Sequence, residues 1–337
     1  MGLAEALEVK ERRKSELLKI EGVTGIGVRN QRLVVYVESS DVAPEIPLRL
    51  DELRVDVVVT GKIRPLVHPL SLQAFATPRT ARWRPSIGGV SVGTPDITAG
   101  TLGCIVLDKS TREPLILSAG HVLSQDYGDL RKAYVGKDCI QPGKYDGGSS
   151  PADRIGGLER WVRVEYEGNL IDAAVAKPDS PDLVKAEILD VGPLYGSVEP
   201  ALQMSVFKSG RTSALTSGRI QDIHATVKVE GWGTVVFEDQ IVTSYMADPG
   251  DSGSALFTYV NNLPYLVGVL HAGSSLVTVH CKFGYVSDLL GVDVGPHVGA
   301  PEEPGWGGLI GGVAPLAAVG LVAVGQEAEK LSKLYYR

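Results

Sequence analysis

The sequence predicts a mainly β protein, in which two packed antiparallel β-barrels follow a small α+β domain and precede an apolar tail. From residue 87 to residue 295, short apolar-alternating runs recur between clusters of Gly, Pro, Asp and Asn. Many short strands at such intervals are typical of paired barrels. A chain of 337 residues with 40 glycines and β-branched runs is also long enough to bury substantial cores. The clearest strand candidates are residues 104–107, 114–118, 161–166, 225–229, 234–237, 255–259 and 265–271.

Residues 1–63 are predicted to form a separate α+β leader domain. Residues 3–20 carry leucines among many charges, which favours a helix with one weakly apolar face. Residues 22–28 and 32–37 have the pattern of a β-hairpin, and a third strand is expected over 53–59.

Residues 64–86 are predicted to be a linker between the leader and the main domain, which spans residues 87–295. The segment contains four prolines and four arginines. Proline removes a backbone donor and fixes φ, so this stretch cannot form a continuous helix or a central strand.

The last 42 residues, 296–337, form a Gly/Pro-rich linker and an apolar tail. Residues 307–325 contain no charge and just reach the length of a membrane-spanning helix. Six glycines and Pro315 would weaken such a helix. Lys330, Lys333 and Arg337 after the segment would favour keeping the C-terminus inside, which would place the main domain outside without a signal to send it there. We therefore favour a buried or self-associating tail over membrane attachment through 307–325 and over a disordered appendage.

The most informative motif is Gly250-Asp251-Ser252-Gly253-Ser254, which places one serine between two glycines after an acid. The N–H groups of Gly250 and Ser252 can face one point and form a two-donor pocket for a developing oxyanion. A hydroxyl is a poor nucleophile at neutral pH, so this motif requires a base and a group that orients the base.

His121 is the candidate base, because an apolar run ends in small residues immediately before it. Asp172 is the candidate orienting acid, because its neighbours are apolar and a buried carboxylate there needs a hydrogen-bond donor. Asp126 and Asp153 also lie between His121 and Ser252, but their surroundings are polar and turn-like, which is typical of a solvated carboxylate.

The chain order His121, Asp172, Ser252 resembles that of the chymotrypsin-like (trypsin-type) serine peptidases, since other Ser-His-Asp hydrolases use different orders. Segments 103–106, 208–220 and 267–274 resemble strands of that family, and the likeness covers about residues 84–295. It is nearest to bacterial and plant cytosolic members, which often carry a leader domain.

The resemblance implies a chymotrypsin-like double β-barrel and a serine endopeptidase acting on proteins or peptides. Ser252 would attack the scissile carbonyl, His121 would transfer the proton and Asp172 would hold the imidazole. Gly250 and Ser252 would supply the oxyanion N–H groups. The alternative is an assembly or scaffold protein that keeps the peptidase fold but is non-catalytic or conditionally latent.

The resemblance also implies where the first substrate pocket lies. Met246 stands where members specific for Lys or Arg carry an acid, which argues against a basic preference. His271 and Gly273 lie on the strand expected to wall this pocket, and a histidine there could donate to a Glu or Gln side chain. The competing interpretations are a small or aliphatic preference and a purely structural His271.

Activation has two interpretations. Ile87-Gly88-Gly89-Val90 is similar to the N-terminus that trypsin-type zymogens expose, whose amine would pair with Asp251. Pro85 directly after Arg84 makes a cut there unfavourable, so we expect other partners for Asp251 and no processing.

Composition excludes several function classes. A net charge of −7 gives no basic surface for nucleic acid, so no nucleic-acid partner is expected. The odd cysteine count argues against disulfides, and the charged N-terminus lacks a secretory signal, so a cytoplasmic location is expected. No metal or organic cofactor is expected, because His271, His280 and Cys281 lack ligand spacing. Self-association is expected through residues 1–63 or the tail.

Overall fold

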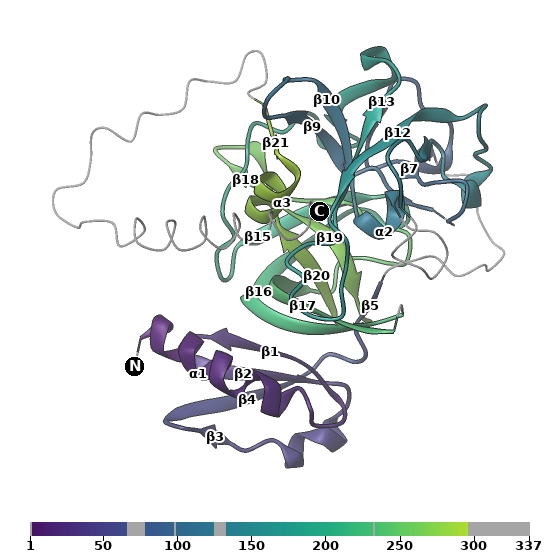
Figure 1. The fold of residues 1–337 in the computed structure, drawn as a ribbon. Coiled ribbons are helices and arrows are strands. Elements are labelled where there is room, and N and C mark those ends of the chain that lie inside the picture. Colours follow the sequence, from purple (N-terminus) through teal and green to yellow (C-terminus); the bar gives the residue numbers. More distant parts are fainter. Residues whose placement is uncertain (1, 66–77, 98, 125–132, 232, 296–337) are drawn as a thin grey trace, which may run out of the picture.

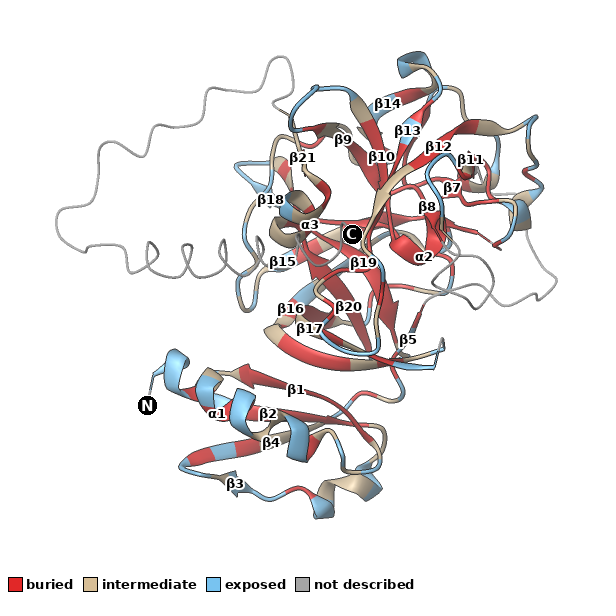
Figure 2. Cartoon of the chain, in the orientation of Figure 1, coloured by how far each residue is buried: buried red, intermediate tan, exposed pale blue. Residues whose placement is uncertain are grey.

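The computed structural model describes residues 2–65, 78–97, 99–124, 133–231 and 233–295 (Figure 1). Strands dominate this part of the chain, so the predicted mainly β fold is confirmed. Figure 2 shows that most strands after residue 86 are largely buried, whereas helix α1 (Leu3–Leu17) exposes its outer face.

Residues 3–59 form a small α+β unit in which α1 lies on a sheet of order β1-β2-β4-β3. Ala6, Val9 and Leu17 point from α1 into a core shared with the strands. Asn30 and Gln31 have φ of 49° and 60°, the left-handed conformation that joins two strands by a two-residue turn. The elements after α1 are β1 (Val23–Arg29), β2 (Arg32–Val37), the 3₁₀ helix η1 (Ser40–Glu45), β3 (Arg49–Leu50) and β4 (Leu53–Val59).

Six strands of the C-terminal half close into an antiparallel barrel. Their order is β15-β18-β19-β20-β17-β16, and a further pairing of β15 with β16 completes the ring. One apolar cluster draws a buried residue from each of five of these strands: Val206, Ile220, Ile241, Leu256 and Val267. The strands are β15 (Ser205–Gly210), β16 (Ala214–Glu230), β17 (Thr234–Ser244), β18 (Ala255–Val260), β19 (Leu263–Gly273) and β20 (Val277–Lys282).

The other large unit is a curved six-stranded sheet of order β11-β12-β13-β10-β9-β21, with the short pairs β6–β14 and β7–β8 beside it (Figure 1). Among the described residues, its pairings do not return to the first strand, so it is less regular than the closed barrel. Its strands are β6 (Ser86–Gly88), β7 (Ser91–Val92), β8 (Gly100–Thr101), β9 (Cys104–Asp108), β10 (Pro114–Ser118), β11 (Asp138–Ile140), β12 (Arg154–Trp161), β13 (Ala174–Pro178), β14 (Val184–Ile188) and β21 (Val292–Asp293). Its helical turns are η2 (Pro78–Thr80), α2 (Gly120–Leu123), η3 (Lys144–Asp146) and η4 (Pro181–Leu183).

A single apolar core joins the curved sheet to the barrel. It combines Val106 and Leu117 of the sheet with Phe257 and Val269 of the barrel. Helix α3 (Phe283–Leu290) follows the last barrel strand and adds Phe283 to this core, and β21 then pairs with β9. The end of the described chain therefore ties the two units together.

The leader sheet continues the barrel sheet, because β1 pairs with β16 through Gly25↔Val227 and Ile26↔Thr226. At this junction, the hydroxyl of Tyr36 donates a 2.7 Å hydrogen bond to the buried carboxylate of Asp222. Burial raises the pKa of Asp222, and the hydrogen bonds it accepts oppose this shift.

The prediction of a strand over residues 161–166 is wrong, because β12 ends at Trp161. Beyond it, the carbonyl of Tyr166 accepts a 2.9 Å hydrogen bond from Val236 of β17. The chain is therefore crossing from the curved sheet to the barrel. Val162 and Val164 pack against different cores on the way, which explains the alternating pattern.

Within the expected linker, the described residues contain the two-residue strand β5 (Arg64–Pro65), which pairs with β19. Residues 66–77 and the tail 296–337, including 307–325, lie outside the described residues. Among the helices that are described, none has the length and apolar character needed to cross a membrane.

Tyr36→Phe is expected to lower the free energy of unfolding by about 1–3 kcal/mol, because it removes a donor from the buried Asp222 carboxylate. Urea denaturation of the full chain measures this change. Tyr166→Phe is the matched control, since that side chain is 64% exposed. Equal stability of the two variants would contradict the role of the Tyr36 hydroxyl.

Candidate active site

His121 lies on α2, the single helical turn that follows β10. The side chain is buried, and its ring Nδ1 lies 2.5 Å from Asp172 Oδ2. The backbone N–H of His121 donates a 2.9 Å hydrogen bond to the other oxygen, Asp172 Oδ1. One carboxylate therefore holds both the main chain and the ring of the same histidine.

Asp172 lies just before β13 and is completely buried. Its backbone N–H donates to the Sγ of Cys281 on β20, at 3.1 Å. Burial alone would raise the pKa of Asp172, but the His121 ring and its hydrogen bonds outweigh this and hold the pKa below its ordinary value. The carboxylate is therefore ionised at neutral pH, as an orienting acid must be.

Ser252 lies in the turn between β17 and β18 and is 1% exposed. Its Oγ makes no hydrogen bond to any residue that the structure describes. The next residue, Gly253, has φ of +94°, and a Cβ there would meet Ser118 Oγ at 2.1 Å and the Ala119 amide at 3.0 Å. Ser118 and Ala119 immediately precede α2. The structure therefore places the serine loop against the turn that carries His121.

The predicted oxyanion donors, the N–H groups of Gly250 and Ser252, differ from the other N–H groups of the serine loop in their hydrogen bonding. Asp251, Gly253 and Ser254 each use their backbone N–H in a hydrogen bond. Among the described residues, the N–H groups of Gly250 and Ser252 donate no hydrogen bond to another backbone group. Gly250 has φ of +101°, and a Cβ on it would come within 2.4 Å of Thr212 Oγ1, so only glycine fits.

Asp251, the acid inside the motif, has partners within the chain. Its buried carboxylate lies 3.0 Å from Lys208 Nζ on β15. It also accepts hydrogen bonds from the backbone N–H groups of Thr212, Ser213 and Asp248, at 2.8–3.1 Å. Ile87, the N-terminus considered in the zymogen interpretation, lies within β6. The serine loop is therefore held without a freed amine.

Sequence reasoning missed Thr101, a completely buried residue at the end of β8. Its N–H donates to the carbonyl of Ser252 at 2.8 Å, and its hydroxyl donates to the carbonyl of Gly250 at 2.9 Å. Its own carbonyl accepts from Ser118 Oγ at 2.7 Å. The buried ion pair of Lys208 with Asp251 was also missed, because the sequence around Lys208 gives no local sign of it.

The structure places the three predicted pocket residues in different surroundings. Met246 is 3% exposed and belongs to the apolar cluster of the barrel. Gly273 ends β19 and pairs with Arg64 of β5. The substrate-pocket roles of these residues stay predictions.

His271 is completely buried, and its Nε2 lies 2.9 Å from Gln240 Oε1. Its ring also lies 4.6 Å from the ring of Phe237, centroid to centroid. Burial lowers the pKa of His271 to about 4, although the charge of Asp172 opposes this shift. Its Nδ1 makes no hydrogen bond to the described residues, and its selection of Glu or Gln substrates stays a prediction.

Of the two acids set aside from the sequence, Asp153 accepts from the Ser149 amide at 3.0 Å and pairs with Arg82 at 3.2 Å, away from His121. Asp126 lies outside the described residues. No group of three or more His, Cys, Asp or Glu side chains suited to a metal ion occurs in the part of the chain that the structure describes.

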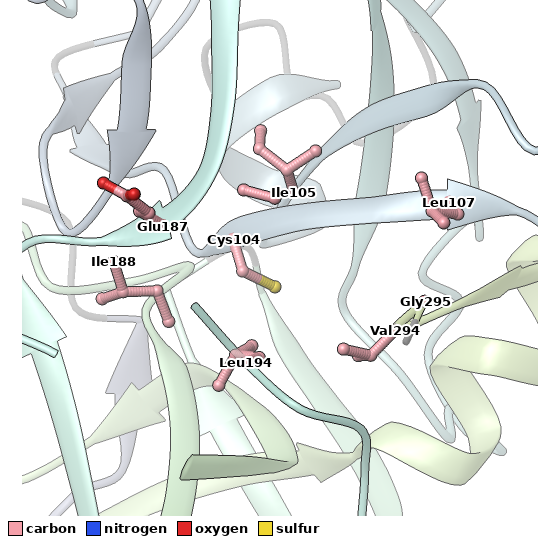
Figure 3. A pocket seen from close by; sticks show the side chains of 9 residues that line it. Cys104, Ile105, Leu107, Glu187, Ile188, Leu194, Val294 and Gly295 are labelled. Carbon is pink, nitrogen blue, oxygen red and sulfur yellow. The ribbon is translucent and has the colours of Figure 1, made fainter. Parts of the chain in front are cut away.

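A cavity of about 90 Å³ lies elsewhere, beside β9 and β14 (Figure 3). None of the predicted site residues lines it. Its wall consists of Cys104, Ile105, Leu107, Ala186, Glu187, Ile188, Leu194, Val294 and Gly295.

Comparison with known proteins gives structural neighbours only. No protein-family model matches the chain. No curated protein matches it either.

Among solved structures, Thermobifida fusca protease A is similar, with 22% identity and a TM-score of 0.46 over 63% of this chain and 98% of that one. A glutamic-acid-specific serine protease has 17% identity and a TM-score of 0.46, over 62% of this chain and 100% of its own. Cellulomonas bogoriensis chymotrypsin has 19% identity and a TM-score of 0.42, over 63% and 98%.

Lys208→Met is expected to lower the free energy of unfolding by about 3–5 kcal/mol, because it leaves the buried Asp251 charge without its cation. Urea denaturation measures the loss. Adding Asp251→Asn should recover part of it. Lys177→Met is the control, because its ion pair with Glu113 is exposed to solvent and should contribute little to stability. Similar losses in the two lysine variants would contradict this assignment.

Acid should destabilise the fold partly through His271, whose folded pKa of about 4 lies below its ordinary value of 6.5. Between these values the unfolded chain binds a proton that the folded chain does not, so stability falls as the pH falls through this window. The full difference amounts to about 3 kcal/mol. His271→Gln should lose less stability between pH 7 and pH 4 in urea titrations. An unchanged loss would exclude His271 as a source.

Proposed function

We propose that this chain is a serine endopeptidase that hydrolyses peptide bonds through an acyl-enzyme formed on Ser252. One observation carries the proposal. A buried serine hydroxyl with no partner among the described residues lies on a loop packed against the turn of His121, and that imidazole is fixed by an ionised carboxylate. This combination supplies a nucleophile, a base and a group that orients the base.

Asp172 determines which nitrogen of His121 acts as the base. An ionised carboxylate accepts hydrogen bonds, so Nδ1 carries the proton that faces Asp172 Oδ2. Nε2 then holds a lone pair and can remove the proton of Ser252 Oγ as this oxygen attacks the substrate carbonyl. The imidazolium that forms is stabilised by Asp172, which stays ionised.

The free N–H groups of Gly250 and Ser252 complete the site. Attack on a peptide carbonyl places negative charge on its oxygen, and these two amides would donate hydrogen bonds that stabilise that charge. His121 then gives its proton to the leaving amine, which leaves an ester on Ser252. Water attacks this ester with His121 again as the base, and the free hydroxyl is regenerated.

The active-serine test uses a fluorophosphonate probe on the full chain. The wild type should be labelled, and Ser252→Ala should not, because the phosphorus is captured by the serine oxygen. Peptide turnover should fall by about four to six orders of magnitude in Ser252→Ala or His121→Ala, and somewhat less in Asp172→Asn. Circular dichroism checks that each variant folds.

Ser86→Ala is the matched control, because Ser86 is also a buried serine but bonds locally to the carbonyl of Trp83. It should label like the wild type. Unchanged labelling of Ser252→Ala would show that another residue is the nucleophile. A wild-type chain that neither labels nor cleaves peptides, alone or with the leader released, would favour the non-catalytic scaffold instead.

A further inference from the structure

One edge of β19 becomes available close to the serine loop. Strand β18 pairs with β19 as far as Ala255↔Val269. Leu270 then exchanges hydrogen bonds with Ser254 and Gly253, at 3.0 and 2.7 Å. Before Gly253 the chain turns away into the Ser252 loop, so β18 does not cover Ala272 and Gly273 on this side.

Strand β5, which follows the leader, covers this edge. It runs antiparallel to β19, with Pro65 opposite Ala272 and Arg64 opposite Gly273. The opposite side of these two residues is already paired with β20. Strand β5 therefore takes the position along the β19 edge that directly follows the serine loop.

The residues before β5 anchor it in place. Ile63 is 1% exposed within a core that includes Ala272, and its carbonyl accepts a 2.9 Å hydrogen bond from the Glu230 amide. The hydroxyl of Ser274 donates to the carbonyl of Thr60. These contacts continue along the chain from the leader into β5, so β5 is held by the leader domain and the barrel together.

A strand whose backbone groups are unpaired on one side can bind an extended peptide, which then adds to the sheet as a further strand. A peptide on the Ala272–Gly273 edge would be aligned by its main chain beside Ser252, whatever its side chains. Strand β5 uses the same backbone groups, so β5 and such a peptide cannot bind together.

We infer that β5 is an internal competitor of peptide substrates: it occupies the substrate's strand position on β19, and peptide cleavage requires that it leave. This inference rests on the proposed endopeptidase function. If β5 is bound in most molecules, the apparent affinity for peptides falls by the fraction of molecules in which the edge is free.

A reversible lock tests this in the full chain. A Cβ built on Gly61 would lie 3.8 Å from Ser274 Cβ, the usual separation across a disulfide. Gly61→Cys combined with Ser274→Cys, oxidised and then reduced, should fix and then release the segment that leads into β5. The three native cysteines are free and buried and should not interfere.

The oxidised double variant should cleave a peptide with kcat/KM at least about tenfold below that of its reduced form. Diisopropyl fluorophosphate has no peptide backbone, so its rate of reaction with Ser252 should change by less than about threefold. Each single cysteine variant, under both conditions, controls for oxidation and for the positive φ of +69° at Gly61.

Three outcomes separate the possibilities. Equal peptide cleavage by the oxidised and reduced forms would overturn the inference. Equal loss of peptide cleavage and of fluorophosphate reaction would show distortion of the site, which also overturns it. No fluorophosphate reaction in any form, wild type included, would instead contradict the proposed function.

A second variant tests release without a disulfide. Ile63→Ala removes the buried anchor next to β5 and should raise peptide kcat/KM several-fold, up to about tenfold. Leu53→Ala is the matched control, because Leu53 is buried in the leader core and belongs to a different cluster from Ile63. An equal rise in both variants would assign the effect to general leader destabilisation and overturn the role of β5.

Discussion

The hydrogen bonds of Thr101 are the interaction on which the rest of the site depends. Thr101 belongs to the short β7–β8 pair beside the curved sheet. Its N–H and hydroxyl hold the carbonyls of Ser252 and Gly250, which belong to a loop of the barrel. Its own carbonyl accepts from Ser118, three residues before His121. One buried residue therefore fixes the serine loop to the histidine turn.

Two buried carboxylates, Asp172 and Asp251, lie in the candidate site, and different partners compensate for the burial of each. Asp172 is satisfied by the ring and backbone of His121 and keeps a lowered pKa despite complete burial. Asp251 is satisfied by Lys208 and three amides. A buried charge that loses its partner is strongly destabilising, so both carboxylates resist rearrangement. The folded chain therefore supplies the partners of both carboxylates.

The sequence was sufficient where the placement of a residue depends on a short motif and insufficient where it depends on distant contacts. His121 and Ser252 stand in motifs that specify their own turns, and the apolar flanks of Asp172 indicated a buried carboxylate. Thr101 and Cys281 act through partners about a hundred residues or more away in the sequence, so no local pattern marks them. The run 161–166 alternates because it touches two cores while crossing between them, and period alone could not separate that from a strand. His271 was placed on the correct strand, but its burial against Gln240 depends on β17, which lies beyond β20 in the sheet order.

The leader and the strand β5 that follows it pair with the barrel at two sheet edges, so the position of the leader affects how β5 is held. Strand β1 extends the sheet beyond β16, and β5 pairs with β19 next to the serine loop. Between these points the chain is held by Tyr36 on Asp222 and by Ile63 in the barrel-side core. Edge pairing uses main-chain groups, so it is strong enough to cover an edge yet replaceable by any other extended chain. A stable leader attached by β1 therefore keeps β5 at high effective concentration beside the edge. Because Ile63 belongs to the barrel-side core and not to the leader core, β5 can leave the β19 edge while residues 3–59 stay folded and attached through β1.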